Sequence, residues 1–224
     1  MTENLGNVLP VYMVADESAS MTPVVDELNA GLAALHQALL REPMAAAKVR
    51  FTILGFSDDV QVRLALADLR TEAALPKLTT RASTSYGAAF QALLTRIPDD
   101  ITTLKSQGYS VFRPAVFFLT DGQPTDEPDW RKQYATLTDK ETTPAAPNII
   151  ACGIGEAKAS TILDIATRPE FAFVAPGTEL GLAIAEFSVA LTKSIVASAR
   201  AAAADKTELV IERPSNFVMA VDVV

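Results

Sequence analysis

Short apolar runs alternate with amphipathic stretches along most of the chain. Apolar runs of this length, bounded by polar or turn-forming residues, predict strands. We expect strands at Val11–Ala15, Val49–Phe56, Val60–Leu66, Ala115–Leu119, Asn148–Gly153 and Phe171–Val174. Because strands that alternate with helices build mostly parallel sheets, the pattern predicts an α/β, three-layer Rossmann-like fold. Its central sheet should have about six strands, with helices on both faces.

Apolar positions spaced by three and four residues predict the helices between these strands. They are expected from Thr22-Pro23 to about Leu40, at Tyr86–Arg96, Asp129–Leu137 and Thr161–Ala166, and over Glu179–Ala203. Ile97-Pro98 should end the helix that begins at Tyr86, because a proline disfavours helical backbone in the residue before it. The turn Ser57-Asp58-Asp59 predicts a hairpin, which makes Val60–Leu66 an antiparallel edge strand.

The C-terminal segment differs in kind from the rest. Two β-favouring runs, Leu209–Ile211 and Phe217–Met219, flank the turn-forming Arg213–Asn216, which predicts an added hairpin. With 224 residues and about 150 residues per typical domain, one large domain is the simplest interpretation. We therefore divide the chain into an α/β domain over residues 1–204 and a β-type extension over residues 205–224.

Charge and cysteine content limit the classes of partner. Nineteen basic against 27 acidic residues leave a net charge of −8, and no basic block is present that would neutralise a phosphate backbone. Nucleic acids and membrane surfaces are therefore not expected partners. The single Cys152 cannot form an internal disulfide. Met1–Asn4 does not begin a signal peptide, and no uninterrupted apolar run reaches the ~18 residues that span a bilayer, so we expect a cytoplasmic protein.

Oxygen-bearing side chains are concentrated after two of the predicted buried strands. Asp16, Ser18 and Ser20 follow the first strand at alternate positions, and Asp121 follows Ala115–Leu119. Thr84 stands just before the helix that opens at Tyr86. Because ligands in open α/β sheets bind beyond the carboxyl ends of the strands, we expect these five side chains to form one site.

The donor set indicates which metal this site would hold. Carboxylates and hydroxyls without imidazole or thiolate suit Mg²⁺, Mn²⁺ or Ca²⁺ rather than zinc or copper. We choose Mg²⁺, which is commonly held by one or two carboxylates and keeps a position for water or a ligand. The simpler interpretation of each piece is structural: Asp16–Ser20 as a capping turn, Thr120-Asp121-Gly122 as a type I turn, and Thr84 as a helix cap.

Taken together, the three pieces resemble the metal-ion-dependent adhesion site (MIDAS) of von Willebrand factor A (VWA) domains. The resemblance rests on Asp16-x-Ser18-x-Ser20, Thr84 before Gly87, and Thr120-Asp121-Gly122, in that order, and covers about residues 8 to 200. It implies metal ligands Asp16, Ser18, Ser20, Thr84 and Asp121, and a cation that captures an acidic residue of a partner protein.

Within this family the chain looks most like bacterial cytoplasmic TerY-type proteins associated with tellurium resistance. The details are Pro10-Val11-Tyr12, Asn29-x-Gly31-Leu32 and Asp121-Gly122-Gln123-Pro124-Thr125-Asp126. This resemblance implies a stress-associated complex and a kinase-like protein or a phosphatase as partner. Two positions depart from the family pattern. Ala19 replaces the usual Gly, and Glu17 replaces Thr or Ser and would add negative charge beside the metal.

Three other residues were considered for function. His36 and Cys152 are expected to be structural, because the histidine lacks partners in sequence and the cysteine lies in an apolar strand. Trp130 is a candidate contact for a partner, since tryptophan is enriched at binding hot spots, but helix packing is the more common role.

Three hypotheses of function remain. The first is a non-enzymatic, metal-dependent protein-interaction module. The second is a metal-dependent phosphotransferase or hydrolase that uses Asp16 as nucleophile or Asp121 as base. It lacks an Asp-x-Asp pair, a nucleophile elbow and a phosphate-binding glycine loop. The third is a structural subunit whose C-terminal extension binds the partner by strand pairing.

Overall fold

The computed structural model describes residues 5–126, 129–206 and 208–223. Its strands are β1 (Asn7–Asp16), β2 (Val49–Phe56), β3 (Val60–Ala67), β4 (Ser110–Val111), β5 (Ala115–Thr120), β6 (Asn148–Gly153), β7 (Ala172–Val174) and β8 (Val218–Met219). Its α-helices are α1 (Val25–Leu40), α2 (Pro43–Ala46), α3 (Tyr86–Ser106), α4 (Trp130–Thr138), α5 (Ala159–Ile165) and α6 (Leu180–Ala203). Met1–Asn4, Glu127, Pro128, Thr207 and Val224 lie outside the described residues.

The strands form one sheet in the order β3-β2-β1-β5-β6-β7-β8, with β4 beside the start of β1. β2, β1, β5, β6 and β7 are parallel, β3 pairs antiparallel with β2, and β8 pairs antiparallel with β7. The predicted α/β fold and the hairpin at Ser57–Asp59 are therefore confirmed. The central β5 is buried along its whole length, which explains its continuous apolar sequence.

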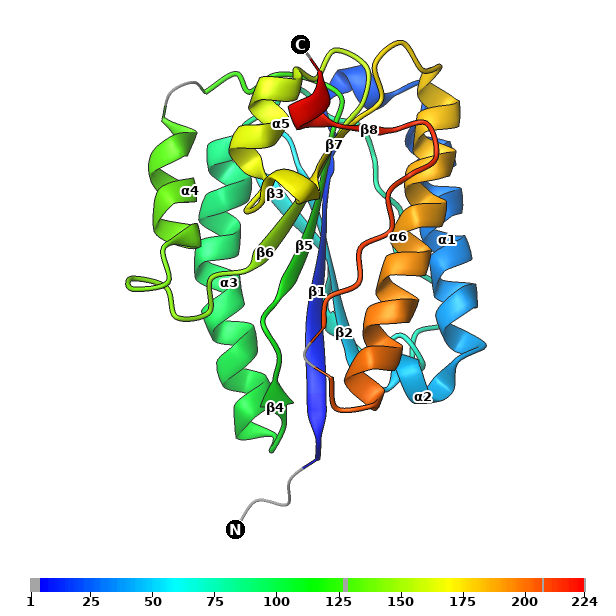
Figure 1. Cartoon of the computed structure of the whole chain (residues 1–224), viewed down its shortest axis with the longest axis vertical. Coiled ribbons are helices and arrows are strands. Elements are labelled where there is room, and N and C mark those ends of the chain that lie inside the picture. The colour runs from blue at the N-terminus through cyan, green and yellow to red at the C-terminus, as the bar shows by residue number, and fades with distance from the viewer. Residues whose placement is uncertain (1–4, 127–128, 207, 224) are drawn as a thin grey trace.

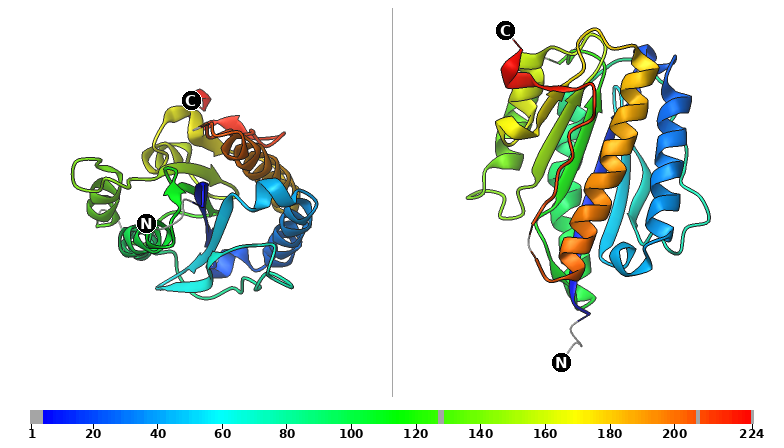
Figure 2. Two further views of the ribbon diagram at one scale, coloured as in Figure 1. Left: turned by 90° about the horizontal axis from the view of Figure 1, so that it is seen from below. Right: turned by 45° about the vertical axis from the view of Figure 1, so that its right-hand side comes forward.

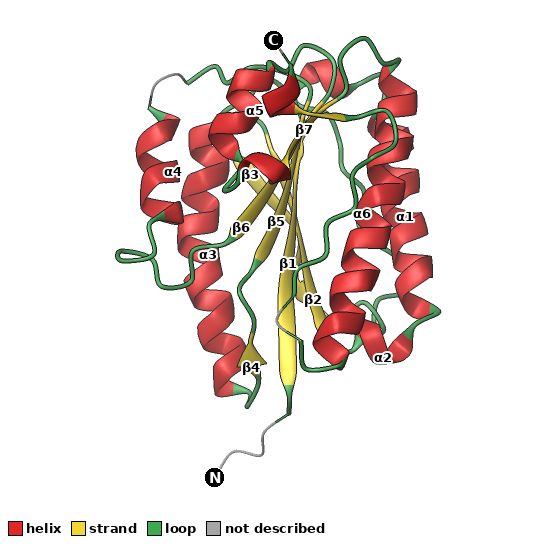
Figure 3. Cartoon of the chain, viewed as in Figure 1, coloured by secondary structure: helices red, strands yellow, loops and turns green. Residues whose placement is uncertain are grey.

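Helices cover both faces of the sheet. α1, α2 and α6 lie on one face, and α3, α4 and α5 lie on the other (Figure 1, Figure 3; seen from below in Figure 2, left). α1 and α6 run side by side because Gly31 carries no side chain: a Cβ there would lie 2.0 Å from Ser188 Oγ. The predicted three-layer arrangement is confirmed. Packing within these layers fixes the ends of β1 and β5, where the predicted site lies.

The helix that begins at Tyr86 is longer than the sequence predicted. It runs through Pro98 to Ser106, so the expected stop at Ile97-Pro98 was wrong. Pro98 lies on the exposed face, while Ile97 and Leu104 are buried against the rest of the protein. Buried Asp100 also accepts a hydrogen bond of 2.9 Å from the Tyr12 hydroxyl of β1. Tertiary contacts on the buried face thus outweigh the hydrogen bond that proline cannot make.

The first and last helices begin within a few residues of their predicted starts. α1 begins at Val25 rather than at Thr22, because a short 3-10 turn, Ala19–Met21, follows β1 first. α6 begins one residue after its cap Glu179, whose carboxylate accepts from the backbone N–H of Gly181 and Leu182. Of the described helices, α6 is the one long and apolar enough to cross a membrane by length and composition. Its buried residues pack against α1 and the sheet, a setting that gives core helices the same composition.

The C-terminal extension does not form the predicted hairpin. Among its described residues only Val218–Met219 is a strand, and it pairs with β7. Leu209–Ile211 instead runs beside α6, where the Ser198 hydroxyl accepts from Val210 N–H and donates to Val210 C=O. Phe217 is 1% exposed. Buried Phe217 and Ala220 therefore help to hold the segment against the domain, along which it runs in Figure 2 (right), whereas Val218, Val221 and Val223 are exposed.

His36 and Cys152 have the structural roles expected of them. His36 is buried, and its Nε2 lies 2.8 Å from the Leu69 carbonyl. Cys152 is buried within β6, where desolvation raises the pKa of its thiol above the ordinary value. Neither side chain is placed for nucleophilic or redox chemistry.

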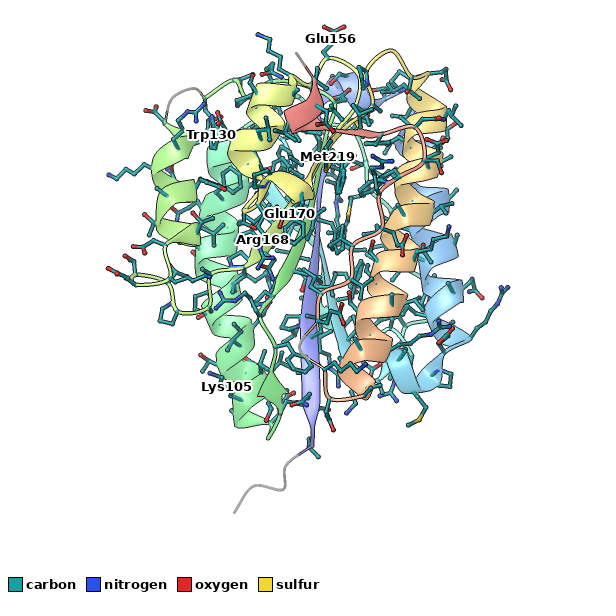
Figure 4. The ribbon with its side chains drawn as sticks, viewed as in Figure 1. Lys105, Trp130, Glu156, Arg168, Glu170 and Met219 are labelled. Carbon is teal, nitrogen blue, oxygen red and sulfur yellow. The ribbon has the colours of Figure 1, made fainter. Side chains whose placement is uncertain are left out.

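Trp130 is not a surface contact for a partner. Its side chain is 0% exposed and packs among the rings of Tyr86, Phe90 and Tyr134. The hypothesis of a partner contact was therefore wrong, and the simpler role in packing α4 onto α3 is what the structure has. Figure 4 labels Trp130 at the start of α4.

Candidate metal centre

The carboxyl ends of β1 and β5 bring the two predicted acidic ligands together. Ala15 of β1 is in register with Leu119 of β5, so the residues that follow both strands leave the sheet at one edge. Asp16 closes β1, and Asp121 comes directly after β5. This edge is the upper end of the molecule in Figure 1.

A chain of hydrogen bonds joins four of the five predicted ligands to one another or to Thr120. The Thr120 hydroxyl donates to Asp16 Oδ2 over 2.7 Å, and the backbone N–H of Ser18 donates to Asp16 Oδ1 over 2.8 Å. The hydroxyls of Ser18 and Ser20 lie 2.9 Å apart, and Ser20 Oγ donates to Asp121 Oδ1 over 2.8 Å. These side chains therefore belong to one hydrogen-bonded network, and the exposed Ser20 brings that network to the protein surface.

Thr84 reaches the same region from a third loop. The predicted capping role belongs to its neighbour: Ser85 is the N-cap of α3 and accepts from Ala88 N–H. The backbone carbonyl of Thr84 accepts from both the N–H and the hydroxyl of Thr125, in the loop after Asp121. Thr84 Oγ1 lies 4.0 Å from the position that a Cβ on Gly122 would take, so the third loop faces the second.

Asp126 fixes the loop that carries Thr84. Its carboxylate accepts from the Ser85 hydroxyl over 2.8 Å and from the backbone N–H groups of Tyr86 and Gly87 over 3.2 and 2.7 Å. A carboxylate at this position also interacts favourably with the partial positive charge at the N-terminus of α3. Asp126 is therefore bound to the protein itself and positions Thr84.

Burial removes water from the carboxylates of Asp16 and Asp121, and a nearby positive charge would compensate for that loss. Desolvation raises the pKa of Asp16 to about 6, and hydrogen bonds from Thr120 and Ser18 offset only part of this effect. Desolvation also raises the pKa of Asp121 above its ordinary value. A cation beside both groups would favour their ionised forms and lower both pKa values.

The donor set fits a hard divalent cation. It comprises two carboxylates and three hydroxyls, which is the oxygen chemistry that Mg²⁺, Mn²⁺ and Ca²⁺ prefer. Among the residues that the structure describes, no group of three or more His, Cys, Asp or Glu side chains is placed to hold a metal. A site in the described part of the chain must therefore draw on hydroxyl oxygens, as this one does.

Glu17 does not add charge beside the metal site, contrary to the sequence expectation. Its side chain is 0% exposed and turns away from Asp16 and Ser18 toward two arginines. Arg63 donates to both of its oxygens over 3.0 and 2.9 Å, and Arg81 Nε donates over 3.0 Å. Gly55 makes room for this carboxylate, because a Cβ there would lie 2.2 Å from Glu17 Cδ. We call Glu17, Arg63 and Arg81 the Glu17 cluster.

The Glu17 cluster and two neighbouring contacts support the site from outside it. Arg81 also donates to the Gly55 carbonyl, and its backbone N–H donates to the Glu17 carbonyl, which ties the segment before Thr84 to the loop after β1. The Tyr86 hydroxyl donates to the Gly122 carbonyl over 3.0 Å. At Ala19 the methyl is tolerated, because no positive φ occurs there; only Leu66 and Asp205 have one among the described non-glycine residues.

Sequence reasoning missed the residues that position the ligands. Thr120 ends β5 and Asp126 follows it in the run that contains Asp121, so their proximity in sequence was a usable signal. Arg63 and Arg81 had none, because their partner Glu17 lies far away in sequence and only the fold brings the three together. All five predicted ligands lie at one edge of the sheet.

Comparisons with known proteins reveal similarity at the level of structure. No protein-family model matches the chain, and no curated protein matches it. The pilus adhesin SpaC from Lactobacillus rhamnosus GG is 13% identical with a TM-score of 0.65, covering 87% of this chain and 31% of the adhesin. A von Willebrand factor type A structure from Catenulispora acidiphila is 17% identical with a TM-score of 0.55, covering 85% and 43%.

A third structure bears on the metal. Proximal thread matrix protein 1 from the mussel byssus, solved with zinc in its MIDAS motif, is 16% identical with a TM-score of 0.53. The match covers 88% of this chain and 47% of that protein, so the chain spans less than half the length of these three structures. At such low identity the likeness establishes the fold alone: this chain has the von Willebrand factor A fold.

Proposed function

We propose that this protein is a metal-dependent protein-interaction module. One observation carries the proposal: oxygens of Asp16, Ser18, Ser20 and Asp121, from two separate strand ends, converge at a solvent-accessible edge, and the Thr84 loop faces them. Two buried carboxylates at that point favour a divalent cation. The zinc-containing MIDAS of the byssus protein, which shares the fold, supports a metal at this place.

We propose Mg²⁺ as the metal, with Mn²⁺ and Ca²⁺ as alternatives. The three hydroxyls are weak ligands for a soft metal, and Mg²⁺ needs few carboxylates because it keeps part of its water shell. The ligands Asp16, Ser18, Ser20, Thr84 and Asp121 leave room for a further oxygen on the solvent side. An aspartate or glutamate of a partner protein is the natural donor at that position.

The geometry favours binding over catalysis. The hydrogen bonds from Ser18 and Thr120 hold the Asp16 carboxylate in place and leave each oxygen a further lone pair, as a metal ligand needs. The single histidine of the sequence, His36, is buried on α1 beside the Leu69 carbonyl and is not placed to act as a catalytic base at this site. Phe217 of the C-terminal extension is buried, which argues against a role for that side chain in strand pairing with a partner.

The biological setting we propose is a bacterial stress-associated complex of the tellurium-resistance type, in the cytoplasm, with a kinase-like protein or a phosphatase as partner. The resemblance of the short motifs to TerY-type proteins is its support. Two of those motif residues have structural roles here: Asn29 exchanges two hydrogen bonds with the backbone of Leu78, and Gly31 lets α1 approach α6.

The test is calorimetric titration of Mg²⁺, Mn²⁺ and Zn²⁺ into chelator-treated protein. We expect one site per chain, with Asp16→Ala abolishing it. Asp26→Asn is the matched control, because Asp26 is an exposed carboxylate on the first turn of α1 at the same end of the molecule. Equal losses in both variants, or no binding to the unsubstituted protein, would refute the metal site.

A further inference from the structure

A pocket lies at the opposite end of the sheet from the candidate metal centre. It has a volume of about 420 Å³, within the range of small-molecule sites. It is formed where the starts of β5 and β6 meet the end of α6 and the first residues of the C-terminal extension. Its lining residues are Leu9, Val111, Phe112, Arg113, Lys140, Asn148, Arg168, Ser198, Ala202, Lys206, Glu208 and Leu209. We call it the basic pocket.

The charge of the basic pocket is opposite to that of the whole chain. Arg113, Lys140, Arg168 and Lys206 line it against a single acid, Glu208, whereas the chain as a whole carries −8. All four cations are exposed, so solvent screens their mutual repulsion, but together they would attract an anion that enters the pocket. Their concentration here therefore indicates an anionic ligand.

The cationic groups keep capacity to bind such a ligand. Arg113 uses one guanidinium nitrogen to donate to the Ala146 carbonyl, which leaves its other N–H groups. Arg168 lies over the Phe171 ring at 5.3 Å. Its guanidinium is 3.8 Å from Glu170, which is longer than a direct hydrogen bond; Figure 4 labels Arg168 and Glu170. Within the described part of the chain, neither Lys140 nor Lys206 has an ion-pair partner.

The remaining walls of the basic pocket are apolar or neutral. Leu9, Val111 and Leu209 supply aliphatic surface, and Phe112 supplies an aromatic ring. Asn148 adds an amide that can donate or accept. A ligand that matches these walls has an apolar or aromatic part beside its negative charge.

We propose that the basic pocket binds a small phosphate ester. A phosphate monoester carries up to two negative charges on three oxygens, which suits several arginine and lysine donors around one pocket better than a single carboxylate does. The phosphate would lie among Arg113, Lys140 and Arg168, and its organic part against Phe112 and Leu209. The phosphate group can belong to a free metabolite or to a phosphorylated side chain of a partner.

The experiment is calorimetric titration of metal-free protein with adenosine 5′-monophosphate, adenosine, and a phosphoserine peptide beside its unphosphorylated form. Metal-free protein keeps this test separate from the metal site, so the failure of one proposal leaves the other standing. We expect one molecule of adenosine 5′-monophosphate per chain, with adenosine at least tenfold weaker. Tighter binding of the phosphoserine peptide would support the same site and identify a protein as the source of phosphate.

The deciding variant is Arg113→Gln/Lys140→Gln, which we expect to weaken phosphate binding at least tenfold. Its matched control is Arg41→Gln/Lys132→Gln, which removes one arginine and one lysine from exposed positions outside the pocket. Thermal melts of both variants establish that they fold. Equal weakening in the two variants would mean general charge attraction and would overturn the proposal, as would the absence of binding by every phosphate probe.

Discussion

The two ends of the sheet in this molecule have opposite chemistry. At the carboxyl ends of β1 and β5, Asp16 and Asp121 form an acidic centre with three hydroxyls. At the other end, the basic pocket gathers Arg113, Lys140, Arg168 and Lys206. We propose a cation as the ligand of the acidic centre and an anion as the ligand of the basic pocket.

The comparison also shows how each site is encoded. Four of the five acidic-centre ligands lie within two short runs, Asp16–Ser20 and Thr120–Gly122, so a reader of the sequence can find them. The basic pocket takes residues from position 9 to position 209, with no motif among them. Residues that share a strand-end loop are close together in the sequence, whereas residues that line a pocket between distant segments are not.

The largest effect should come from Asp121→Ala, which separates the two ends. We expect loss of detectable Mg²⁺ binding, because Asp121 is one of only two carboxylates in the centre, and no change in phosphate binding at the basic pocket. The fold should persist, since Asp121 lies in the loop directly after β5 and outside the hydrophobic core. Titration and a thermal melt measure both. Loss of the cooperative unfolding transition would contradict a site at the edge.

Glu17→Gln should destabilise the acidic end by about 3 kcal/mol. The substitution keeps the shape of the side chain but leaves Arg63 and Arg81 without their buried counter-charge, the costly way to break an ion pair. The two arginines are 18% and 19% exposed, which keeps the effect at the lower end of the range for buried pairs. Urea unfolding measures it, with Glu27→Gln on the exposed face of α1 as control. Similar unfolding midpoints for the two variants would show that the cluster is dispensable.

The acidic centre should depend on pH because of Asp16. Its pKa is raised to about 6 from 3.8, so the folded state binds a proton more tightly than the unfolded state does. Without metal, stability should therefore fall as the pH rises from 3.8 to 6, and then stay level. Mg²⁺ needs the ionised carboxylate, so its affinity should fall about tenfold for each pH unit below that pKa.

Titrations of Mg²⁺ at pH 7, 6 and 5 test this dependence. An Mg²⁺ affinity that is constant from pH 7 to pH 5 would show that Asp16 is ionised throughout.

The smallest effect should come from Ser198→Ala at the wall of the basic pocket. The Ser198 hydroxyl makes two hydrogen bonds with the backbone of Val210, and their loss should cost about 1 kcal/mol. Hydrogen exchange of the C-terminal extension should rise, and phosphate binding should weaken slightly as Leu209 loses its support. Ser160→Ala on exposed α5 is the control. Unchanged exchange would mean that other contacts, such as those of Phe217, hold the segment alone.

The alternation of apolar runs and amphipathic stretches was enough to predict the parallel sheet, because each buried strand and each helix face leaves its own local pattern. Val49–Phe56 and Asn148–Gly153 were predicted with the bounds that the structure has. The proximity of Asp16, Ser18, Ser20 and Asp121 was also predictable, since strand-end loops keep such residues close in sequence. Local patterns failed where packing competes with them: α3 continues through Pro98 because its neighbouring residues are buried.

Only the tertiary structure decided the rest. It directs the Glu17 side chain toward Arg63 and Arg81 and away from the predicted metal site, because a side chain at a strand end can face either side of the sheet. It placed the apolar C-terminal runs against α6 and β7 rather than in a hairpin with each other. It also assembled the basic pocket, because charges far apart in sequence become one electrostatic site only when the chain folds.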